Sequence, residues 1–182
     1  MTFSAPRTAL ILGGARSGKS RFAEDIVART GLPAVYLATA EIRDAEMQAR
    51  ISAHRAWRGL DWTTVEEPLD LTARLAELAD PGRVILVDCL TLWLSNLMEA
   101  ERDVAAEGDA LARMLAEAKG PVVLVSNEVG SGIVPMNALA RRFADEQGRL
   151  NQKIAGAVQT VFLVAASLPV RLKPNPNPEF VL

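Results

Sequence analysis

The chain contains a single cysteine, Cys89, and a single histidine, His54. A lone cysteine cannot form an intrachain disulfide, and Cys89 lies in an apolar run, as is consistent with a reducing cytoplasm. Any reaction that needs an imidazole has only His54 to use.

The sequence also lacks an excess of positive charge and a long hydrophobic run. Lys and Arg number 20 against 22 Asp and Glu, so the formal net charge is -2 and the pI is near 5.5. No positive field is present to hold a phosphodiester backbone, which argues against a nucleic-acid partner. No apolar run reaches about 18 residues, and MTFSAPR leads into a strand pattern without a signal-peptide core. We expect a cytoplasmic protein with no membrane span.

The pattern of the chain predicts one α/β domain. Short aliphatic runs alternate with longer amphipathic stretches, which is typical of a mostly parallel sheet flanked by helices in three layers. The catalytic domain is expected to span residues 1–173, and the Pro- and Asn-rich residues 174–182 to form an extended tail. Strands are expected at 9–12, 34–38, 84–88, 122–126 and 161–164, and helices at 19–30, 44–57, 70–79, 91–118 (broken near Gly108) and 136–159.

A phosphate-binding motif lies near the start of the chain. GGARSGKS satisfies G-x-x-x-x-G-K-[ST] and stands between an expected strand and an expected helix. Glycines let the backbone approach phosphate oxygens, and the first N–H groups of the helix bind them. Lys19 is expected to reach the β and γ phosphates, and Ser20 to hold Mg²⁺. Arg16 is either a second phosphate contact or a solvated side chain.

A carboxylate for the magnesium ion is expected at the end of another strand. The hydrophobic run VILVD ends in Asp88, as a P-loop site requires. Asp88 is therefore the predicted metal-side carboxylate, and its alternative role is to cap the following helix. Cys89 stands next, where motors that hydrolyse ATP often have a glutamate, and this counts against a motor.

His54 extends the apolar face of the helix expected at 44–57. Met47, Ile51 and His54 fall at i, i+4 and i+7 and so share one face. Two roles are open for the imidazole. It is either a partly buried group hydrogen-bonded to a neighbour, or a neutral nucleophile that attacks phosphorus. Nearby arginines would lower its pKa and stabilise phosphate charge, but spacing does not distinguish the two roles.

Four collinear stretches resemble a known family. They read ALILGGARSGKSRFAE, VYLATAEIRDAEMQARISAHR, VILVDCLTLWLSNL and VVLVSNEVGSGIVPMNALARRFADEQGRLNQKIA, within about residues 7–173. The combination of GGARSGKS with YLATA, R-I-x-x-H-R and NEVGSGIVP is similar to the bifunctional adenosylcobinamide kinase/adenosylcobinamide-phosphate guanylyltransferase family of cobalamin biosynthesis. The resemblance implies a RecA-like P-loop fold, usually in a homotrimer.

The resemblance further implies two reactions. An NTP, either ATP or GTP, phosphorylates the hydroxyl of the aminopropanol arm of adenosylcobinamide. GTP then transfers GMP to that phosphate through a covalent GMP-histidine, giving adenosyl-GDP-cobinamide and pyrophosphate. The nucleophilic histidine of the family corresponds to the last residue of R-I-x-x-H, which is His54.

The same resemblance carries the nucleotide contacts onto this chain. Lys19 joins His54 as a catalytic residue, and Ser20 and Asp88 are the expected ligands of Mg²⁺. The nucleotide-binding residues that the resemblance implies are Gly13, Gly14, Ala15, Arg16, Ser17, Gly18, Lys19, Ser20, Ala38, Thr39, Ala40, Arg55, Ala56, Trp57, Arg58, Glu66 and Asp88.

Asn127 and Glu128 follow the strand expected at 122–126. A RecA-like sheet places its γ-phosphate sensor at this position, beside the P-loop. Glu128 is the third predicted catalytic residue, which would activate the substrate hydroxyl or its bound water. The other interpretation is a turn built by Asn127, Gly130 and Gly132.

Two other functions fit parts of the sequence. One is a simple P-loop kinase for a small alcohol, in which His54 is structural. The other is a RecA-like motor acting on DNA, and the acidic pI and the missing glutamate after Asp88 weigh against it.

Overall fold

The computed structural model describes residues 7–40 and 62–174. They contain a seven-stranded sheet with the order β3-β2-β4-β5-β1-β6-β7. Every neighbouring pair is parallel except β6 and β7, which are antiparallel. The strands are β1 (Thr8–Gly13), β2 (Ala34–Ala38), β3 (Trp62–Glu66), β4 (Val84–Asp88), β5 (Val122–Asn127), β6 (Thr160–Ala165) and β7 (Leu168–Lys173).

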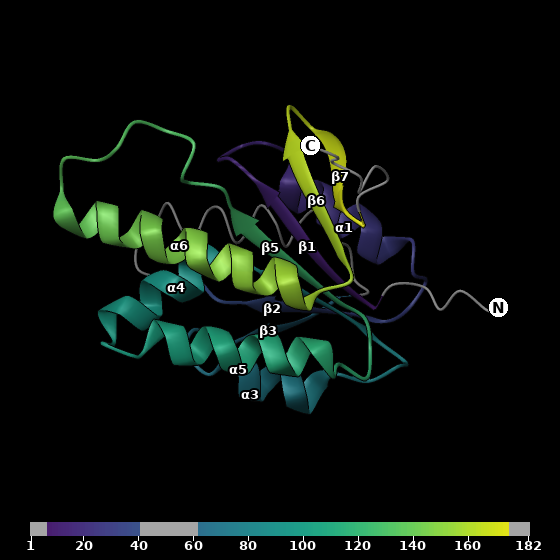
Figure 1. Ribbon diagram of the computed structural model, residues 1–182. Coiled ribbons are helices and arrows are strands. Elements are labelled where there is room, and N and C mark those ends of the chain that lie inside the picture. Colours follow the sequence, from purple (N-terminus) through teal and green to yellow (C-terminus); the bar gives the residue numbers. More distant parts are fainter. Residues whose placement is uncertain (1–6, 41–61, 175–182) are drawn as a thin grey trace, which may run out of the picture.

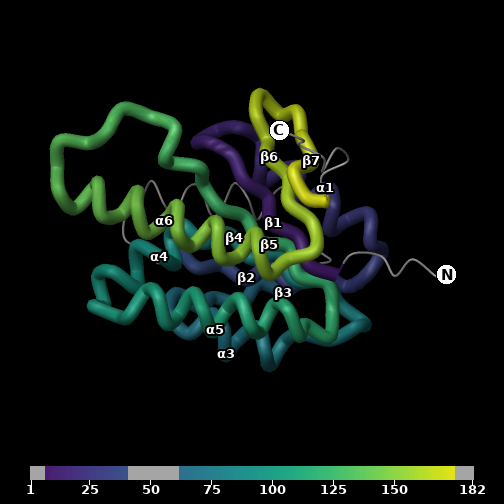
Figure 2. Tube along the Cα trace, in the orientation of Figure 1, coloured from purple at the N-terminus to yellow at the C-terminus, as the bar shows by residue number. Residues whose placement is uncertain are grey.

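Helices cover both faces of this sheet, which confirms the predicted three-layer α/β arrangement. Figure 1 shows α1 on the opposite side of the sheet from α5 and α6, and Figure 2 traces the same arrangement along the chain. No described helix is long and apolar enough to cross a membrane. The described helices are α1 (Lys19–Ala28), α3 (Leu71–Leu78), α4 (Leu90–Glu99), α5 (Val104–Ala116) and α6 (Ala138–Ala157).

The central strands are apolar at successive positions because each strand is buried on both faces. Leu10 and Val87 belong to the core that contains α3 to α6, where Trp93 is fully buried. Ile11 and Leu86, one position away on the same strands, pack in the second core beneath α1. Successive side chains of a strand point to opposite faces, so uninterrupted aliphatic runs are what a two-sided sheet requires.

Two edge strands were not predicted from the sequence. All five residues of β3 pair with β2, and β7 folds back antiparallel on β6. Each has partners on only one side in the described sheet, so neither needs the continuous apolar run of a central strand. On β7 the apolar residues Leu168, Val170 and Leu172 are even exposed.

The helix expected at 91–118 is broken, but not near Gly108. α4 ends at Glu99 and α5 starts at Val104, with Asp103 as its N-cap accepting a hydrogen bond from Ala106 N. Gly108 lies inside α5, where a Cβ atom would come within 3.3 Å of Leu150 Cδ1 on α6. The predicted position of the break was wrong. Gly108 allows α5 and α6 to pack closely, whereas the break occurs where Asp103 caps the start of α5.

Two other expectations fall outside the described residues. The helix expected at 44–57 and the tail beyond residue 174 both lie there. The helix expected at 136–159 is α6, which begins two residues later because the Asn137 side chain caps it by accepting hydrogen bonds from Leu139 N and Ala140 N.

Candidate nucleotide-binding site

The phosphate loop lies at the C-terminal end of β1 and leads directly into α1. β1 ends at Gly13 and α1 begins at Lys19, as the motif predicts. Arg16 and Gly18 have positive φ angles of 58° and 92°, so the chain turns sharply before the helix. The Lys19 ammonium is folded over the loop and donates to the Gly14 carbonyl at 3.2 Å. Backbone N–H groups and one ammonium therefore surround the space above the loop.

The glycines of the motif are needed because the loop packs closely against the turn between β6 and β7. A Cβ atom on Gly13 would lie 2.6 Å from the Val164 carbonyl, and one on Gly18 would lie 2.6 Å from Ser167 Oγ. Ser167 N also donates to Ser17 O at 2.8 Å. The motif alone does not reveal this contact, since it comes from the far end of the sequence.

A cavity of about 540 Å³ lies over the loop. It brings together several predicted phosphate-binding residues, and Lys19, Arg16 and Arg21 give it three positive side chains. The cationic wall and the N-terminus of α1 favour an anion such as a polyphosphate. The residues that line it are Ala15, Arg16, Ser17, Gly18, Lys19, Ser20, Arg21 and Asn127.

Asp88 lies at the C-terminal end of β4, opposite Ala38 in the register with β2. It is not the N-cap of α4, because that position belongs to Cys89. Its Oδ2 accepts a hydrogen bond from the Tyr36 hydroxyl at 3.1 Å, which orients the carboxylate. The alternative helix-capping role is therefore not the one observed.

The donor set is of the kind that suits Mg²⁺. The Ser20 hydroxyl and the Asp88 carboxylate are hard oxygen ligands, and Mg²⁺ usually takes one or two of these together with phosphate oxygens and water. Among the residues that the structure describes, no cluster of three or more His, Cys, Asp or Glu side chains could hold a metal by itself. These residues suit a Mg²⁺ ion that binds together with a nucleotide better than a metal ion held by protein side chains alone.

Thr39, a predicted nucleotide contact, is fully buried and its hydroxyl is used inside the protein. The hydroxyl donates to the Cys89 carbonyl at 2.7 Å and accepts from Cys89 N at 2.9 Å. Thr39 N also donates to Asp88 O at 3.3 Å. The side chain of Thr39 therefore positions the backbone that carries Asp88.

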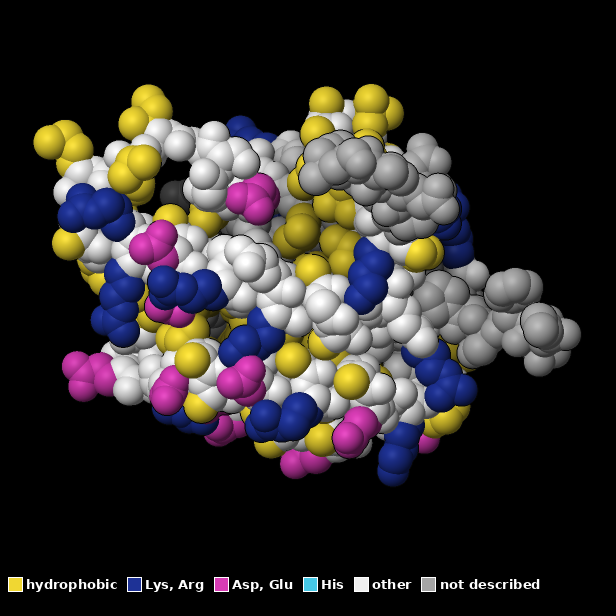
Figure 3. All heavy atoms as spheres, in the orientation of Figure 1, with side chains coloured by type: hydrophobic (Ala, Val, Ile, Leu, Met, Phe, Trp, Pro, Cys, Tyr) yellow, Lys and Arg dark blue, Asp and Glu magenta, His cyan; other side chains and the backbone are white. Residues whose placement is uncertain are grey.

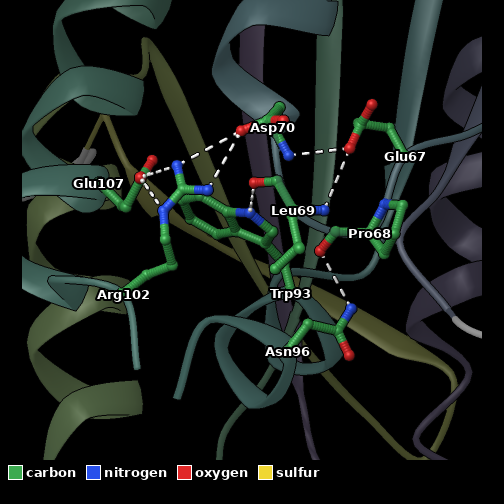
Figure 4. A network of polar contacts seen from close by, with 8 residues as sticks. All are labelled: Glu67, Pro68, Leu69, Asp70, Trp93, Asn96, Arg102 and Glu107. Atoms are coloured by element: carbon green, nitrogen blue, oxygen red, sulfur yellow. Dashed lines mark hydrogen bonds and ion pairs between the residues drawn. The ribbon is translucent and has the colours of Figure 1, made fainter. Parts of the chain in front are cut away.

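A polar network fixes the neighbouring segment after β3 (Figure 4). Asn96 Nδ2 donates both to the Thr39 carbonyl at 2.8 Å and to the Pro68 carbonyl at 3.0 Å. Trp93 Nε1 donates to the Leu69 carbonyl at 2.9 Å. One face of α4 thus holds the chain ends of both β2 and β3.

The other predicted residues among those described lie at or just beyond the C-terminal ends of β2, β3 and β4. Ala38 pairs with Glu66 on β3 as well as with Asp88 on β4, so the three lie across adjacent strand ends. None of them lines the cavity over the phosphate loop, and neither does Ala40. His54, Arg55, Ala56, Trp57 and Arg58 lie outside the described residues.

Asn127 is the last residue of β5 and Glu128 follows it, and the two side chains have different surroundings. Glu128 Oε1 accepts a hydrogen bond from Gly130 N at 2.8 Å, so its carboxylate builds the turn that was the other interpretation. Asn127 lines the phosphate cavity. The sequence signal for Asn127 is its position at the end of a strand beside the P-loop, which the sequence analysis gives to Asn127 and Glu128 together.

The arrangement as a whole defines a P-loop nucleotide-binding protein with a RecA-like α/β fold. Solved structures share this fold at low sequence identity. The flagellar accessory protein FlaH from Methanocaldococcus jannaschii matches with a TM-score of 0.53 and 13% identity, covering 97% of this chain and 83% of its own. The RadB recombinase matches with a TM-score of 0.51 and 16% identity, covering 87% and 74%.

Sequence comparison narrows this class to one family. The chain belongs to the family described as cobinamide kinase / cobinamide phosphate guanyltransferase, whose profile matches residues 9–172. It is 50% identical to the bifunctional adenosylcobalamin biosynthesis protein CobP of Pseudomonas aeruginosa over 92% of this chain and 98% of that protein. It is 41% identical to the bifunctional protein CobU of Salmonella typhimurium over 90% of this chain and 98% of that protein. The predicted family is confirmed.

The site also generates a prediction about its only thiol. Burial and the neighbouring Asp88 carboxylate raise the pKa of Cys89 to about 11, and backbone hydrogen bonds from Leu92 and Thr91, with the Lys19 charge, offset only part of this rise. At pH 8 a thiol with that pKa is ionised in roughly one molecule per thousand, and the thiolate is the reactive form. We therefore expect the native protein to resist an aromatic disulfide reagent at pH 8.

The same protein in denaturant is the control, and it should release one equivalent of chromophore because the sequence holds one cysteine. Rapid stoichiometric reaction of the folded protein at pH 8 would show that the thiol is neither buried nor protonated.

Proposed function

We propose that this protein phosphorylates the aminopropanol hydroxyl of adenosylcobinamide with ATP or GTP and then transfers GMP from GTP to that phosphate. The product of the second reaction is adenosyl-GDP-cobinamide. The observation that carries this proposal is the cationic cavity over the phosphate loop in a chain that matches the family over residues 9–172.

In the phosphorylation step, the nucleotide's phosphate chain lies in the cavity above the loop. The loop amides and the Lys19 ammonium bind its oxygens and stabilise the charge that develops as the γ-phosphoryl group leaves. The substrate oxygen forms a bond to the γ-phosphorus, the bond to the β-phosphate oxygen breaks, and the hydroxyl proton is released. Mg²⁺, held by Ser20 and Asp88, would supply charge neutralisation for the phosphates.

The second step passes through His54. An imidazole nitrogen forms a bond to the α-phosphorus of GTP, and pyrophosphate leaves with the electrons of the broken P–O bond. The phosphate oxygen of the substrate then attacks the same phosphorus and the N–P bond breaks, which restores the histidine. One difficult displacement becomes two easier ones. The remaining GTP contacts that we propose are Arg55, Ala56, Trp57, Arg58, Ala38, Thr39, Ala40 and Glu66.

We also propose that the chain acts as a cytoplasmic homotrimer. Apolar side chains in the loop between β5 and α6 support association with another copy, since Ile133 and Met136 are each 98% exposed. Figure 3 shows hydrophobic side chains protruding where this loop lies in Figure 1. Exposed apolar groups that gather on one loop are typical of an interaction surface.

The covalent intermediate is tested by labelling. With GTP labelled at the α-phosphorus, we expect the wild-type chain to carry a label that is acid-labile and base-stable, as a phosphoramidate is. His54→Ala should lose the label and still phosphorylate cobinamide, because the kinase step does not use the imidazole. GTP labelled at the γ-phosphorus is the control and should leave the chain unlabelled.

Two results would contradict this mechanism. A label that persists in His54→Ala would place the nucleophile elsewhere. Absence of label while phosphorylation proceeds would instead identify a simple P-loop kinase in which His54 is structural.

The role of Glu128 is tested by Glu128→Gln. The amide keeps an oxygen that accepts the hydrogen bond from Gly130 N, so the turn is retained, whereas the base is removed. If Glu128 activates the substrate hydroxyl, the phosphorylation rate should fall about 100-fold, with the melting temperature and GMP labelling unchanged. If Glu128→Gln phosphorylates cobinamide at the wild-type rate, Glu128 has no catalytic role and only stabilises the turn.

The trimer is tested by sedimentation velocity. We expect a species of three times the 19.6 kDa chain mass, and partial dissociation of this species for Ile133→Asp, because a charge on the apolar loop opposes burial. Glu117→Lys, an exposed substitution just after α5, is the control and should leave the mass unchanged. A wild-type monomer at micromolar concentration would contradict the proposal.

A further inference from the structure

The chain contains a single tyrosine, Tyr36, and its side chain reaches the predicted metal-side carboxylate. Tyr36 pairs with Leu86 in the register between β2 and β4, and Asp88 lies two residues beyond Leu86. Residues two apart on a strand share a face of the sheet, and an aromatic side chain is long enough to reach such a diagonal neighbour. The Tyr36 hydroxyl accordingly donates to Asp88 Oδ2 at 3.1 Å.

The tyrosine ring itself is held by packing. Tyr36 is 7% exposed and belongs to the core beneath α1. Trp62 on β3 packs against it edge to face, with the two ring centroids 6.5 Å apart. A ring that is fixed in this way presents its hydroxyl at a defined point, so the hydrogen bond restricts the rotation of the Asp88 carboxylate.

The residue that follows β2, Thr39, holds the backbone at the same strand end. Thr39 N donates to Asp88 O at 3.3 Å, and the Thr39 hydroxyl bonds both backbone groups of Cys89. These buried bonds are rigid, because breaking any one of them leaves an unpaired polar group away from water. The backbone contacts therefore set where the Asp88 side chain begins, and the Tyr36 contact sets how its carboxylate is turned.

The Asp88 carboxylate is close to the phosphate loop and only partly buried. Burial and the Asp88 charge raise the pKa of the Cys89 thiol, and the Lys19 charge lowers it, so both charged groups lie within electrostatic reach of one sulfur atom. Mg²⁺ demands near-octahedral geometry and usually takes only one or two carboxylates, so the orientation of each one matters for binding. Removing a group that orients a metal ligand typically lowers metal affinity by about 10-fold or more.

We propose that Tyr36 is a positioning residue for Asp88, and that its hydroxyl sets the affinity with which the site binds Mg²⁺ together with a nucleotide. This inference rests on the proposed function, since it concerns the Mg²⁺ ion of the phosphorylation step. In this role Tyr36 contacts neither the metal nor the nucleotide and acts only through the carboxylate. Without the hydroxyl the carboxylate would rotate more freely, and its ordering would then oppose metal binding.

The role is tested by calorimetric titration with a non-hydrolysable triphosphate analogue, once with Mg²⁺ and once with a chelator. Tyr36→Phe removes the hydroxyl and keeps the ring that packs against Trp62. For this variant we expect affinity for the analogue with Mg²⁺ to fall about 10-fold, as for loss of a group that orients a metal ligand. Affinity for the metal-free analogue should stay within about 2-fold of the wild-type value, because the phosphate loop is unchanged.

A double-variant cycle shows whether the effect passes through Asp88. In an Asp88→Ala background, Tyr36→Phe should cause no further loss of affinity with Mg²⁺, since the group that it positions is absent. Because the chain has one tyrosine, the Raman signature of tyrosine hydrogen bonding reports Tyr36 alone, and Asp88→Ala should change it. Thr30→Val is the matched control, since it removes a hydroxyl that donates to Val27 O before the other end of β2. It should leave both affinities at the wild-type values.

The outcomes separate this proposal from the proposed function. A wild-type affinity of Tyr36→Phe for the analogue with Mg²⁺, or an equal loss with and without Mg²⁺, would overturn the positioning role. Additive effects of Tyr36→Phe and Asp88→Ala would do the same. Failure of the proposed function gives a different result, namely wild-type protein that binds the analogue with Mg²⁺ and shows the Tyr36 effect but does not phosphorylate cobinamide.

Discussion

The pairing of β1 between β5 and β6 determines where each part of the phosphate site lies. β1 delivers Gly13 to the start of the loop, and its pairing with β5 sets Asn127 directly opposite. Its pairing with β6 brings the β6–β7 turn against Gly18, where only a glycine fits. Because parallel strands end at one edge of the sheet, groups from separate parts of the chain converge there. A shift of one residue in this register would turn every side chain of the strand to the opposite face of the sheet, and the groups of the site would no longer meet.

Buried polar contacts make this convergence rigid. The Thr39 hydroxyl bonds both backbone groups of Cys89 and so fixes the end of β4 that carries Asp88. Asn96 joins the ends of β2 and β3, and Asn151 holds the end of β5. Each strand end is thus held by a side chain from a neighbouring element rather than by further sheet pairing. Such contacts contribute little net stability, but a group left unpaired is costly, so they specify one arrangement.

The local features of the sequence predicted the central part of the fold well. Runs in which successive residues are all aliphatic identified five strands. Those strands are covered on both faces of the sheet and therefore need apolar residues at every position. β3 and β7 were missed because an edge strand needs no such run. Gly108 was read as a helix breaker, but its meaning depends on α6, which packs against it from some forty residues further along the chain. The hydrogen bonds between the buried Thr39 hydroxyl and the Cys89 backbone likewise join residues fifty positions apart, and no local pattern predicts them.

The sequence by itself determined the phosphate-loop motif and the family, and it led to the predicted roles of Lys19, Ser20 and Asp88. These features are contiguous motifs whose conformation follows from local backbone geometry, and a motif of that kind can be recognised without knowing its neighbours. Only the tertiary structure decided that Asn127 faces the cavity while the Glu128 carboxylate closes a turn. Adjacent residues at a strand end point in different directions, and the contacts from α4 and α6 that select between them are made across long sequence separations.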